Sequence, residues 1–412
     1  KGIKVRIIGG KGRDEIIDES RIRGWTKKTF VYDTKANNKL RLGSEGKDLT
    51  SNNPYYNEYD YKAFMHNLYM PLASFGYNTD DGIFTGLGCL IKMHRFKKFP
   101  FAASHKLNAN YAFATNAYNF KYDGIFTSAF FGLDLNLHLE YRSPTYTQNY
   151  FGLGNNSKLT NTDWDYHRVR IGLININPEL SKSFKNYNTL AIGILYQSFD
   201  LEKTPGRFIS EVNLSEINSY IFKRLNYFGL KASYVLDVRN NKVIPSRGIL
   251  WNTEVKSYYG ISDSARAYSQ LKSELSLYMS FRKPYRTIFA FRLGGSINSG
   301  DYEFFQACSL GGKYNLRGYR ATRFSGDACL YQNSELRFKL FNFSNYISKG
   351  QVGIIGFNDI GRVWLKGENS KKWHHGYGGG LWISPFNMAV VCATYDFSQE
   401  DDMLSVKFNF LF

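Results

Sequence analysis

One arginine, Arg317, lies inside a glycine-rich segment, LGGKYNLRGYR at 310–320, and two acidic residues follow it at strand-like spacing. Glu335 lies in NSELRF, and Asp359 lies in FNDIGRVW. A guanidinium offers a planar fork of donors that a carboxylate accepts in bidentate fashion, which fixes a loop more firmly than a lysine does. We therefore expect Glu335 and Asp359 to pair with Arg317 in a confined space. Whether such a group only braces the fold or also serves its function is left open by the sequence.

Alternating residues at 133–142 predict a strand with two different faces. Five apolar residues interleave there with five polar ones, in LDLNLHLEYR. Side chains alternate across a strand, so one row can face lipid while the other faces a wet lumen. The C-terminal residues alternate in the same way, and the expected lipid-facing row is Leu404, Val406, Phe408, Phe410 and Phe412.

The composition favours a membrane barrel over a helical membrane protein. The chain holds 31 Tyr and 33 Phe, or 17% aromatic residues with Trp, which suits two interfacial girdles. No apolar stretch approaches the roughly 20 residues that a membrane helix needs. A barrel satisfies its backbone hydrogen bonds between strands and needs apolar residues only at alternate positions.

Two regions are expected along the chain: a polar periplasmic or pre-barrel segment at 1–80 and a transmembrane barrel at 81–412. About sixteen strand-like segments recur in the second region, an even number, as single-chain outer-membrane barrels require. The expected strands are 82–95, 103–115, 118–131, 133–143, 163–176, 187–199, 208–222, 227–239, 248–260, 267–282, 285–298, 327–341, 350–364, 374–384, 387–398 and 403–412. The fold class is thus all-β, an antiparallel transmembrane barrel with an internal glycine-rich arginine loop.

The formal net charge of +18 favours anionic lipid and lipopolysaccharide as partners over nucleic acid. The basic residues are scattered, without an arginine-rich helix or a recognisable nucleic-acid module. The four cysteines are too far apart for a zinc site, and Cys308 and Cys329 flank the arginine segment, either bridged or as isolated thiols. His374 and His375 are adjacent and project to opposite faces, so no metal site, cofactor or catalytic group is predicted.

The segment LGGKYNLRGYR resembles the signature loop of the BamA/TamA family of outer-membrane assembly proteins, in the bacterial surface antigen superfamily. Four further motifs agree in order: YFGLGN at 150–155, DVRNNKVIPSRG at 237–248, GFNDIGRVW at 356–364 and GGGLWISPF at 378–386. The resemblance implies a sixteen-stranded barrel with this loop in its lumen, in the bacterial cell outer membrane.

The resemblance also implies roles for particular residues. The lumenal loop motif would be Gly311, Gly312, Leu316, Arg317, Gly318 and Tyr319, with Asp359 and Glu335 as partners of its arginine. Phe408, Phe410 and Phe412 would form the C-terminal signal for barrel assembly. A lateral seam would separate the first strand, near 82–95, from the last, near 403–412, and Gly86 and Gly88 would weaken the first strand.

The function implied is assembly, insertion or translocation of proteins or lipids, without enzymatic activity and with client barrels and periplasmic or lipoprotein subunits as partners. The N-terminal stretch is too short for the several periplasmic POTRA domains that most members carry. Its opening, KVRIIGGKGRDEIIDES, instead resembles the stretch that precedes the barrel in fusions of a phosphoesterase to such a barrel. A barrel that anchors a periplasmic partner, or a passive pore, is therefore the alternative.

The same opening contains GGKGRD at 9–14, which resembles one turn of a calcium-binding β-roll repeat. Such sites need stacked neighbouring turns to complete the coordination shell. Only one copy is evident in the sequence, so we expect an ordinary glycine turn.

Overall fold

The structure is a computed structural model of the chain, and it divides into two compact units. One comprises Lys1–Leu68 with Lys92–Ala102, and the other comprises Tyr69–Ile91 with Ala103–Phe412. The residues that the structure describes are 4–10, 12–21, 28–35, 38–52, 57–59, 65–78, 82–159, 163–185, 187–211, 219–280, 285–346 and 348–412.

The N-terminal unit is built from short strands that pair in parallel. One sheet has the order β1-β3-β5, and a second sheet contains β2 and β4. Their bounds are β1 (Val5–Ile8), β2 (Glu15–Asp18), β3 (Thr29–Tyr32), β4 (Lys39–Leu42) and β5 (Gly46–Asp48). Parallel pairs need a crossover connection between the strands, so successive segments of this unit lie in register above one another rather than in hairpins.

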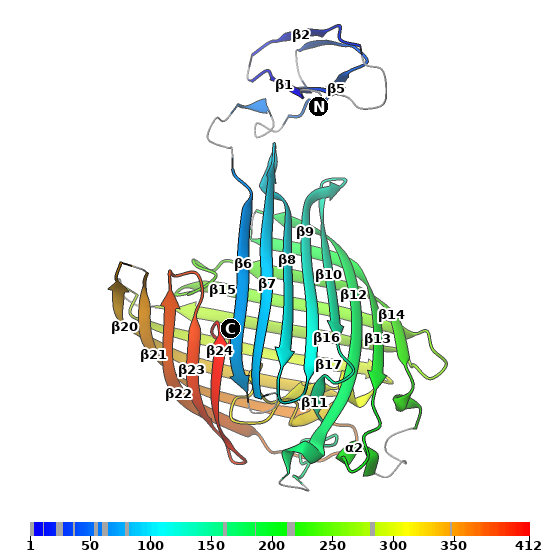
Figure 1. The fold of residues 1–412 in the computed structure, drawn as a ribbon, viewed down its shortest axis with the longest axis vertical. Helices are drawn as coiled ribbons and strands as arrows, with labels where there is room; N and C mark the ends of the chain where they lie inside the picture. Colours follow the sequence, from blue (N-terminus) through cyan, green and yellow to red (C-terminus); the bar gives the residue numbers. More distant parts are fainter. Residues whose placement is uncertain are drawn as a thin grey trace. The chain divides into compact units, whose positions relative to one another are not determined.

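The second unit is a closed barrel whose strands connect to their neighbours along the chain, with β24 beside β6 (Figure 1). Short β11 (Thr147–Asn149) lies beside β12. The long strands are β6 (Leu68–Asn78), β7 (Gly82–Arg95), β8 (Lys98–Ala112), β9 (Ala117–Phe130), β10 (Leu133–Arg142), β12 (Arg168–Phe184), β13 (Asn188–Leu201), β14 (Leu225–Asp237), β15 (Gly248–Gly260), β16 (Tyr268–Met279), β17 (Thr287–Gly300), β20 (Ala328–Ser344), β21 (Lys349–Trp364), β22 (His374–Pro385), β23 (Val391–Phe397) and β24 (Asp402–Phe408). Consecutive long strands from β8 to β24 pair in antiparallel register.

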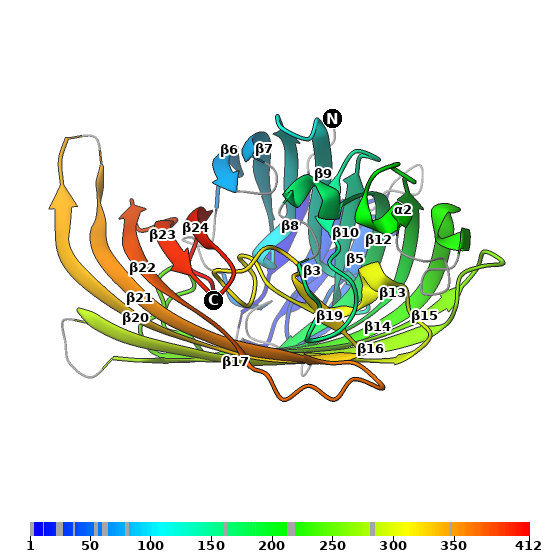
Figure 2. The ribbon, with the colours of Figure 1, turned by 90° about the horizontal axis from the view of Figure 1, so that it is seen from below.

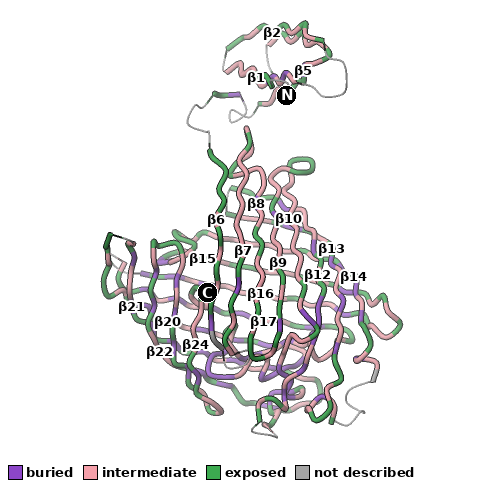
Figure 3. Tube along the Cα trace, viewed as in Figure 1, coloured by how far each residue is buried: buried purple, intermediate pink, exposed green. Residues whose placement is uncertain are grey.

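The predicted alternation of faces is visible along β20 and β21. Tyr331, Glu335 and Arg337 are buried, while Leu336 between them is 54% exposed. On β21, Phe357 and Asp359 are buried, and Ile354 is 43% exposed. The same alternation marks β22, next to β21 (Figure 3), whereas the residues of β10 are nearly all half-buried. The buried row faces the lumen, and the exposed row is apolar because it faces the membrane.

Many of the charged side chains in the lumen form ion pairs, either between strands or along one strand. Lys231 on β14 lies 2.6 Å from Glu179 on β12 and 3.6 Å from Glu254 on β15. Lys256 lies 2.7 Å from Glu254, and Lys272 on β16 lies 3.3 Å from Glu274. Part of the basic excess therefore lines the interior of the barrel.

One end of the barrel carries the long connections. These join β10 to β12, β13 to β14 and β17 to β20, whereas short turns join β9 to β10 and β20 to β21 at the other end. Apolar side chains from the long connections pack with those at the ends of β12 and β13, in a cluster that contains Tyr150, Val169, Ile171, Leu201, Ile209 and Ile221. Figure 2 shows the β17–β20 connection, with β19 (Phe324–Gly326), inside the ring of strands.

Two predicted strand assignments are corrected by the structure. Residues 208–222 were expected to form a strand, but the described part is α2 (Phe208–Glu211) and the 3-10 helix η2 (Ser219–Phe222). Their apolar residues pack in the cluster at the long connections. Apolar residues at alternating positions can serve such a cluster as well as a strand face, so the sequence pattern does not separate the two. Conversely, β6 (Leu68–Asn78) precedes the expected first strand, so Gly86 and Gly88 lie on the second barrel strand.

The close packing of β8 against β7 explains why these two positions are glycines. A Cβ on Gly88 would lie 2.2 Å from the Leu107 carbonyl oxygen, and one on Gly86 would lie 2.8 Å from the Ala109 carbonyl oxygen. The two glycines therefore allow β8 to approach closely. Among the described residues, no helix has the length and apolarity that crossing a membrane requires.

A charge placed on the lipid face should destabilise the barrel far more than the same charge in the lumen. Leu230 on β14 is 61% exposed. Leu230→Arg should lower the free energy of unfolding by about 2–4 kcal/mol if the residue lies near the bilayer midplane. Ser233→Arg, on the opposite face of the same strand and paired in register with Glu254, is the control and should change it by less than about 1 kcal/mol. Urea titration in liposomes measures both, and equal losses would contradict the assigned faces.

Candidate functional site

The arginine loop, residues 311–323, connects two short antiparallel strands, β18 (Cys308–Leu310) and β19. Gly311 and Gly318 have φ values of 125° and 84°, a region that favours glycine. A Cβ on Gly318 would also lie 2.4 Å from the Phe397 carbonyl oxygen. Asn315 braces the turn because its side chain accepts from the Gly311 N–H at 2.9 Å and donates to the Ser309 carbonyl at 2.9 Å.

Arg317 is held on four sides. Its Nε and Nη2 donate to the two oxygens of Asp359, each at 2.7 Å, and its Nη1 donates to Glu335 Oε1 at 2.7 Å. Its backbone N–H also donates to Asp359, at 3.1 Å. The guanidinium carbon lies 3.6 Å from the centre of the Phe357 ring. The arginine is 2% exposed and both carboxylates are 0% exposed, so the pair is removed from bulk water.

The second oxygen of Glu335 binds another arginine, which the sequence analysis did not identify. Arg337 Nε and Nη2 donate to Glu335 Oε2 at 2.9 and 2.6 Å. Two guanidinium groups thus face two carboxylates, so the cluster of Arg317, Arg337, Glu335 and Asp359 has no formal net charge. Burial acts to lower the pKa of Arg317, but the charges of Asp359 and Glu335 raise it above its ordinary value.

The chain end lies in the lumen rather than on the lipid face. Strand β24 ends at Phe408, which is 49% exposed, and Asn409 adopts a left-handed φ of 71°. Arg337 Nη2 then donates to the Phe412 carbonyl at 2.9 Å, and its guanidinium lies 3.9 Å from the Phe410 ring centre. The prediction that Phe410 and Phe412 continue the lipid-facing row is therefore wrong, because the turn at Asn409 reverses their direction.

Two apolar residues of the loop anchor it to the barrel wall. Leu316 and Tyr319 are 0% and 1% exposed and belong to a cluster with Cys308, Leu310, Phe324, Cys329, Tyr331 and Val363. The His374 ring stacks on Phe324 at 3.6 Å and meets Tyr319 edge-on. His375 is exposed, as expected for its neighbour on the strand. The four cysteines are free thiols.

The loop is also tied to the long connections at its end of the barrel. Arg323, 1% exposed, donates to both oxygens of Glu400 at 2.6 and 2.9 Å and to Ser157. Asn155, in the YFGLGN motif, is fully buried and links three segments. Its backbone N–H binds Glu368, its amide donates to Ser370 and the Lys372 carbonyl, and its Oδ1 accepts the Val363 N–H.

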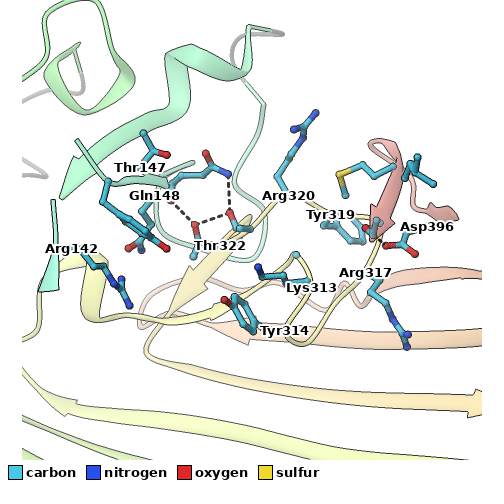
Figure 4. A pocket seen from close by; sticks show the side chains of 18 residues that line it. Arg142, Thr147, Gln148, Lys313, Tyr314, Arg317, Tyr319, Arg320, Thr322 and Asp396 are labelled. Carbon is cyan, nitrogen blue, oxygen red and sulfur yellow. Dashed lines mark hydrogen bonds between the residues drawn. The ribbon is translucent and has the colours of Figure 1, made fainter. Parts of the chain in front are cut away.

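A cavity of about 320 Å³ lies between the arginine loop and strands β11 and β24. Four basic side chains, Arg142, Lys313, Arg317 and Arg320, line it together with Asp396 (Figure 4). Arg142 is paired with Glu140 at 2.8 Å, and Arg320 with Asp401 at 3.2 Å. Among the described residues, no group of three or more His, Cys, Asp or Glu side chains is placed to hold a metal ion.

Two signals for the missed residues were present in the sequence. Arg337 is two positions after Glu335, and residues at that spacing share one face of a strand. Arg292 on β17 was not identified either, although its Nη2 donates to the Tyr314 carbonyl of the loop at 2.6 Å and its Nε to Asn333 at 3.0 Å. Only the three-dimensional register shows that these arginines reach the same lumenal space.

The barrel and its clamped arginine loop agree with the comparison of the sequence with known families. Residues 104–412 match the Omp85 superfamily domain. The match covers more than half of the chain, and the chain therefore belongs to the Omp85 superfamily. It is a β-barrel protein of the bacterial outer membrane of the kind involved in protein insertion or transport. No curated protein matches the sequence.

Solved structures support the fold. The structure is similar to BamA from Haemophilus ducreyi lacking POTRA domains 1–3, with a TM-score of 0.60 at 15% identity, over 84% of this chain and 70% of that one. It is also similar to CdiB from Escherichia coli, with a TM-score of 0.53 at 11% identity, over 89% of this chain and 65% of that one. The chain thus spans less than two thirds of that CdiB chain. At these identities the likeness concerns the fold alone.

Loss of the loop arginine should be strongly destabilising. Arg317→Ala removes the side-chain partner of the buried Asp359 and leaves Glu335 with Arg337 alone, so the free energy of unfolding should fall by about 3–5 kcal/mol. Arg317→Lys retains the charge but not the bidentate geometry and should recover only part of this. Urea titration in detergent micelles measures the loss. Lys313→Ala, an exposed position of the same loop, is the control. An unchanged midpoint for Arg317→Ala would contradict the clamp.

Asn155 should be a second point of sensitivity. Asn155→Ala removes an amide that is fully buried and leaves the Val363 N–H unpaired, so we expect a loss of about 1–3 kcal/mol. Asn156→Ala, at the exposed neighbouring position, should cost less. The same titration, combined with protease cleavage of the long connections, measures both effects. Equal sensitivity of the two variants would show that Asn155 is not the link between these segments.

Proposed function

We propose that this barrel acts in the assembly, insertion or translocation of proteins or lipids at the outer membrane, through a lateral seam between β6 and β24. The observation that carries the proposal is the end of the wall at β24. The last strand stops at Phe408, and the left-handed turn at Asn409 directs the following residues into the lumen. An edge whose final residues leave the wall retains backbone donors and acceptors for a client strand.

The strands next to this edge are short. The β23–β24 ladder joins seven residue pairs, whereas the β20–β21 ladder joins sixteen. On the other side of the proposed seam, β6 contains Pro71, which has no N–H to donate. The seven-residue length of β24 and the proline of β6 limit the backbone hydrogen bonds that can join these two strands, which favours separation between them. The proposed seam therefore lies at β6 rather than at the strand expected from the sequence.

A chain of side chains connects the arginine loop with the residues beside the seam. Arg317 and Arg337 share Glu335, and Arg337 also holds the Phe412 carbonyl. Movement of the chain end would remove one partner of Arg337 and disturb the charge balance around Glu335. We infer that the loop stabilises the closed seam, and that this role is added to its bracing of the barrel.

The proposed partners are inferred from the surfaces of the barrel and from the family to which the chain belongs. Outer-membrane lipids would contact the apolar outer face, and the anionic groups of lipopolysaccharide would meet basic residues at the long-loop end, which faces the cell exterior in barrels of this kind. Client barrel proteins would be the substrates, with periplasmic or lipoprotein subunits as helpers. The proposed role is positioning of strands, without a catalytic step.

A second role is supported by the N-terminal unit. Its strands pair in parallel, as β1-β3-β5 and β2-β4, which differs from the mixture of helices and strands in POTRA domains. Client delivery by such domains is thus not supported by the described residues. This unit fits a barrel that anchors a periplasmic partner, such as an upstream phosphoesterase, better than it fits an insertase.

The two roles are separated by reconstitution into liposomes. If the seam is active, the protein should speed the folding of an added barrel client at least about tenfold, because an open edge templates strand pairing. Cysteine pairs scanned between residues 72–74 of β6 and 405–407 of β24 should block this when oxidised and restore it on reduction. The control pair is Leu381→Cys with Ala393→Cys, registered partners on β22 and β23.

Each other outcome has a distinct meaning. Acceleration that survives every oxidised seam pair would overturn the seam. Leakage of solute without faster client folding would identify a passive pore. If neither activity is seen, the anchoring role replaces the insertase.

A further inference from the structure

In the N-terminal unit, the turns that connect the strands are stacked on one another, which the sequence analysis did not predict. Val5 pairs with Thr29 and Glu15 pairs with Lys39, so both sheets have the same offset of 24 residues. The first turn, between β1 and β2, therefore lies in register with the second turn, between β3 and β4. The GGKGRD turn therefore does have a stacked neighbouring turn, although this second turn lacks the glycines of the first.

A buried carboxylate lies between these turns. Asp33 begins the second turn and is 0% exposed. Its Oδ2 and Oδ1 lie 2.4 and 2.7 Å from the position that a Cβ on Gly9 would occupy, so the carboxylate fills the space left by that glycine. Oδ1 accepts the Thr34 N–H at 2.6 Å, but Oδ2 has no hydrogen-bond partner. A buried carboxylate with an unpaired oxygen is strongly destabilising unless a cation or a proton compensates it.

A second carboxylate faces the same turn. Asp14 ends the first turn, and its Oδ2 is also buried and without a hydrogen-bond partner. Its oxygens lie 3.6 and 3.7 Å from the position of a Cβ on Gly12. Among the described residues, neither Asp14 nor Asp33 forms a salt bridge.

Hydrogen bonds link the two carboxylates across the turns. The Asp14 N–H donates to Asn38 Oδ1 at 3.0 Å, and the Asn38 amide donates to the carbonyl and hydroxyl of Thr34 at 3.1 and 3.0 Å. Thr34 in turn donates its N–H to Asp33. The turns are thus held together by neutral groups, which leaves one oxygen of each carboxylate uncommitted.

We propose that Asp33 and Asp14 bind a calcium ion between the two stacked turns. Calcium takes six to eight oxygen ligands from carboxylates, amides and backbone carbonyls, at flexible geometry. The described acidic and hydroxyl side chains of the two turns offer oxygen ligands, which soft metals do not favour. Glycines in the first turn let its backbone carbonyls approach an ion closely. The ion would neutralise the buried Asp33 carboxylate and stabilise the stacked turns, because the site exists only in the folded unit.

Calcium titration of the full chain, purified in detergent and stripped of metal, tests the site by isothermal calorimetry. We expect one saturable binding event, weakened at least tenfold in Asp33→Asn and in Asp14→Asn. Asp48→Asn makes the same chemical change at an exposed position of β5 and should bind like the unaltered protein. Equal binding by Asp33→Asn and Asp48→Asn would overturn the assignment, as would the absence of any binding event.

A second measurement needs no substitution and does not depend on client insertion. In the unaltered protein, calcium should slow protease cleavage within residues 1–68 at least fivefold relative to a chelator. Cleavage at the same rate in both conditions would contradict a calcium ion at Asp33. Equal protection by magnesium at the same concentration would overturn the choice of calcium.

Discussion

The pairing of Arg317 with Asp359 and Glu335 fixes the interior of this barrel. A guanidinium taken out of water is costly to bury, and only close partners on all its donors compensate. Here Asp359 takes Nε and Nη2 together, so both the position and the orientation of the arginine are defined. The carboxylates belong to two adjacent wall strands, β20 and β21. The loop is therefore fastened to the wall, and the contacts that it makes with the long connections depend on that attachment.

The shared carboxylate of Glu335 extends this constraint to the end of the chain. One oxygen binds Arg317 and the other binds Arg337, which also holds the Phe412 carbonyl and stacks on Phe410. Both guanidinium groups bind the same carboxylate, so loss of either one leaves Glu335 with a single ion-pair partner. In the proposed mechanism, a displacement of the chain end would reach the loop through Arg337 and Glu335.

Part of this arrangement could be predicted from the sequence, and the rest could not, for physical reasons. Alternation of side chains identified most wall strands, because lipid and lumen impose a period of two. It failed at 208–222, where apolar residues serve a loop cluster, and at β6, where Pro71 and Gly76 weaken the pattern. Arg317 and its carboxylates stood out through residue type and family motifs. The roles of Arg337 and Asn155 depend on register and on the turn at Asn409, which no local pattern encodes.

The same physics explains why opening would be confined to one place. Around most of the wall, long ladders join neighbouring strands, and lumenal ion pairs of Lys231 with Glu179 and Glu254 link β14 with β12 and β15. Separating β20 from β21 would break sixteen registered pairs and pull apart the two carboxylates of Arg317. The β23–β24 ladder is less than half as long, and beyond it Asn409 donates its N–H to the Val390 carbonyl while Arg337 holds the Phe412 carbonyl. In the proposed mechanism, movement of β24 would involve fewer registered pairs than separation of β20 from β21, and it would leave the clamp between Arg317, Glu335 and Asp359 in place.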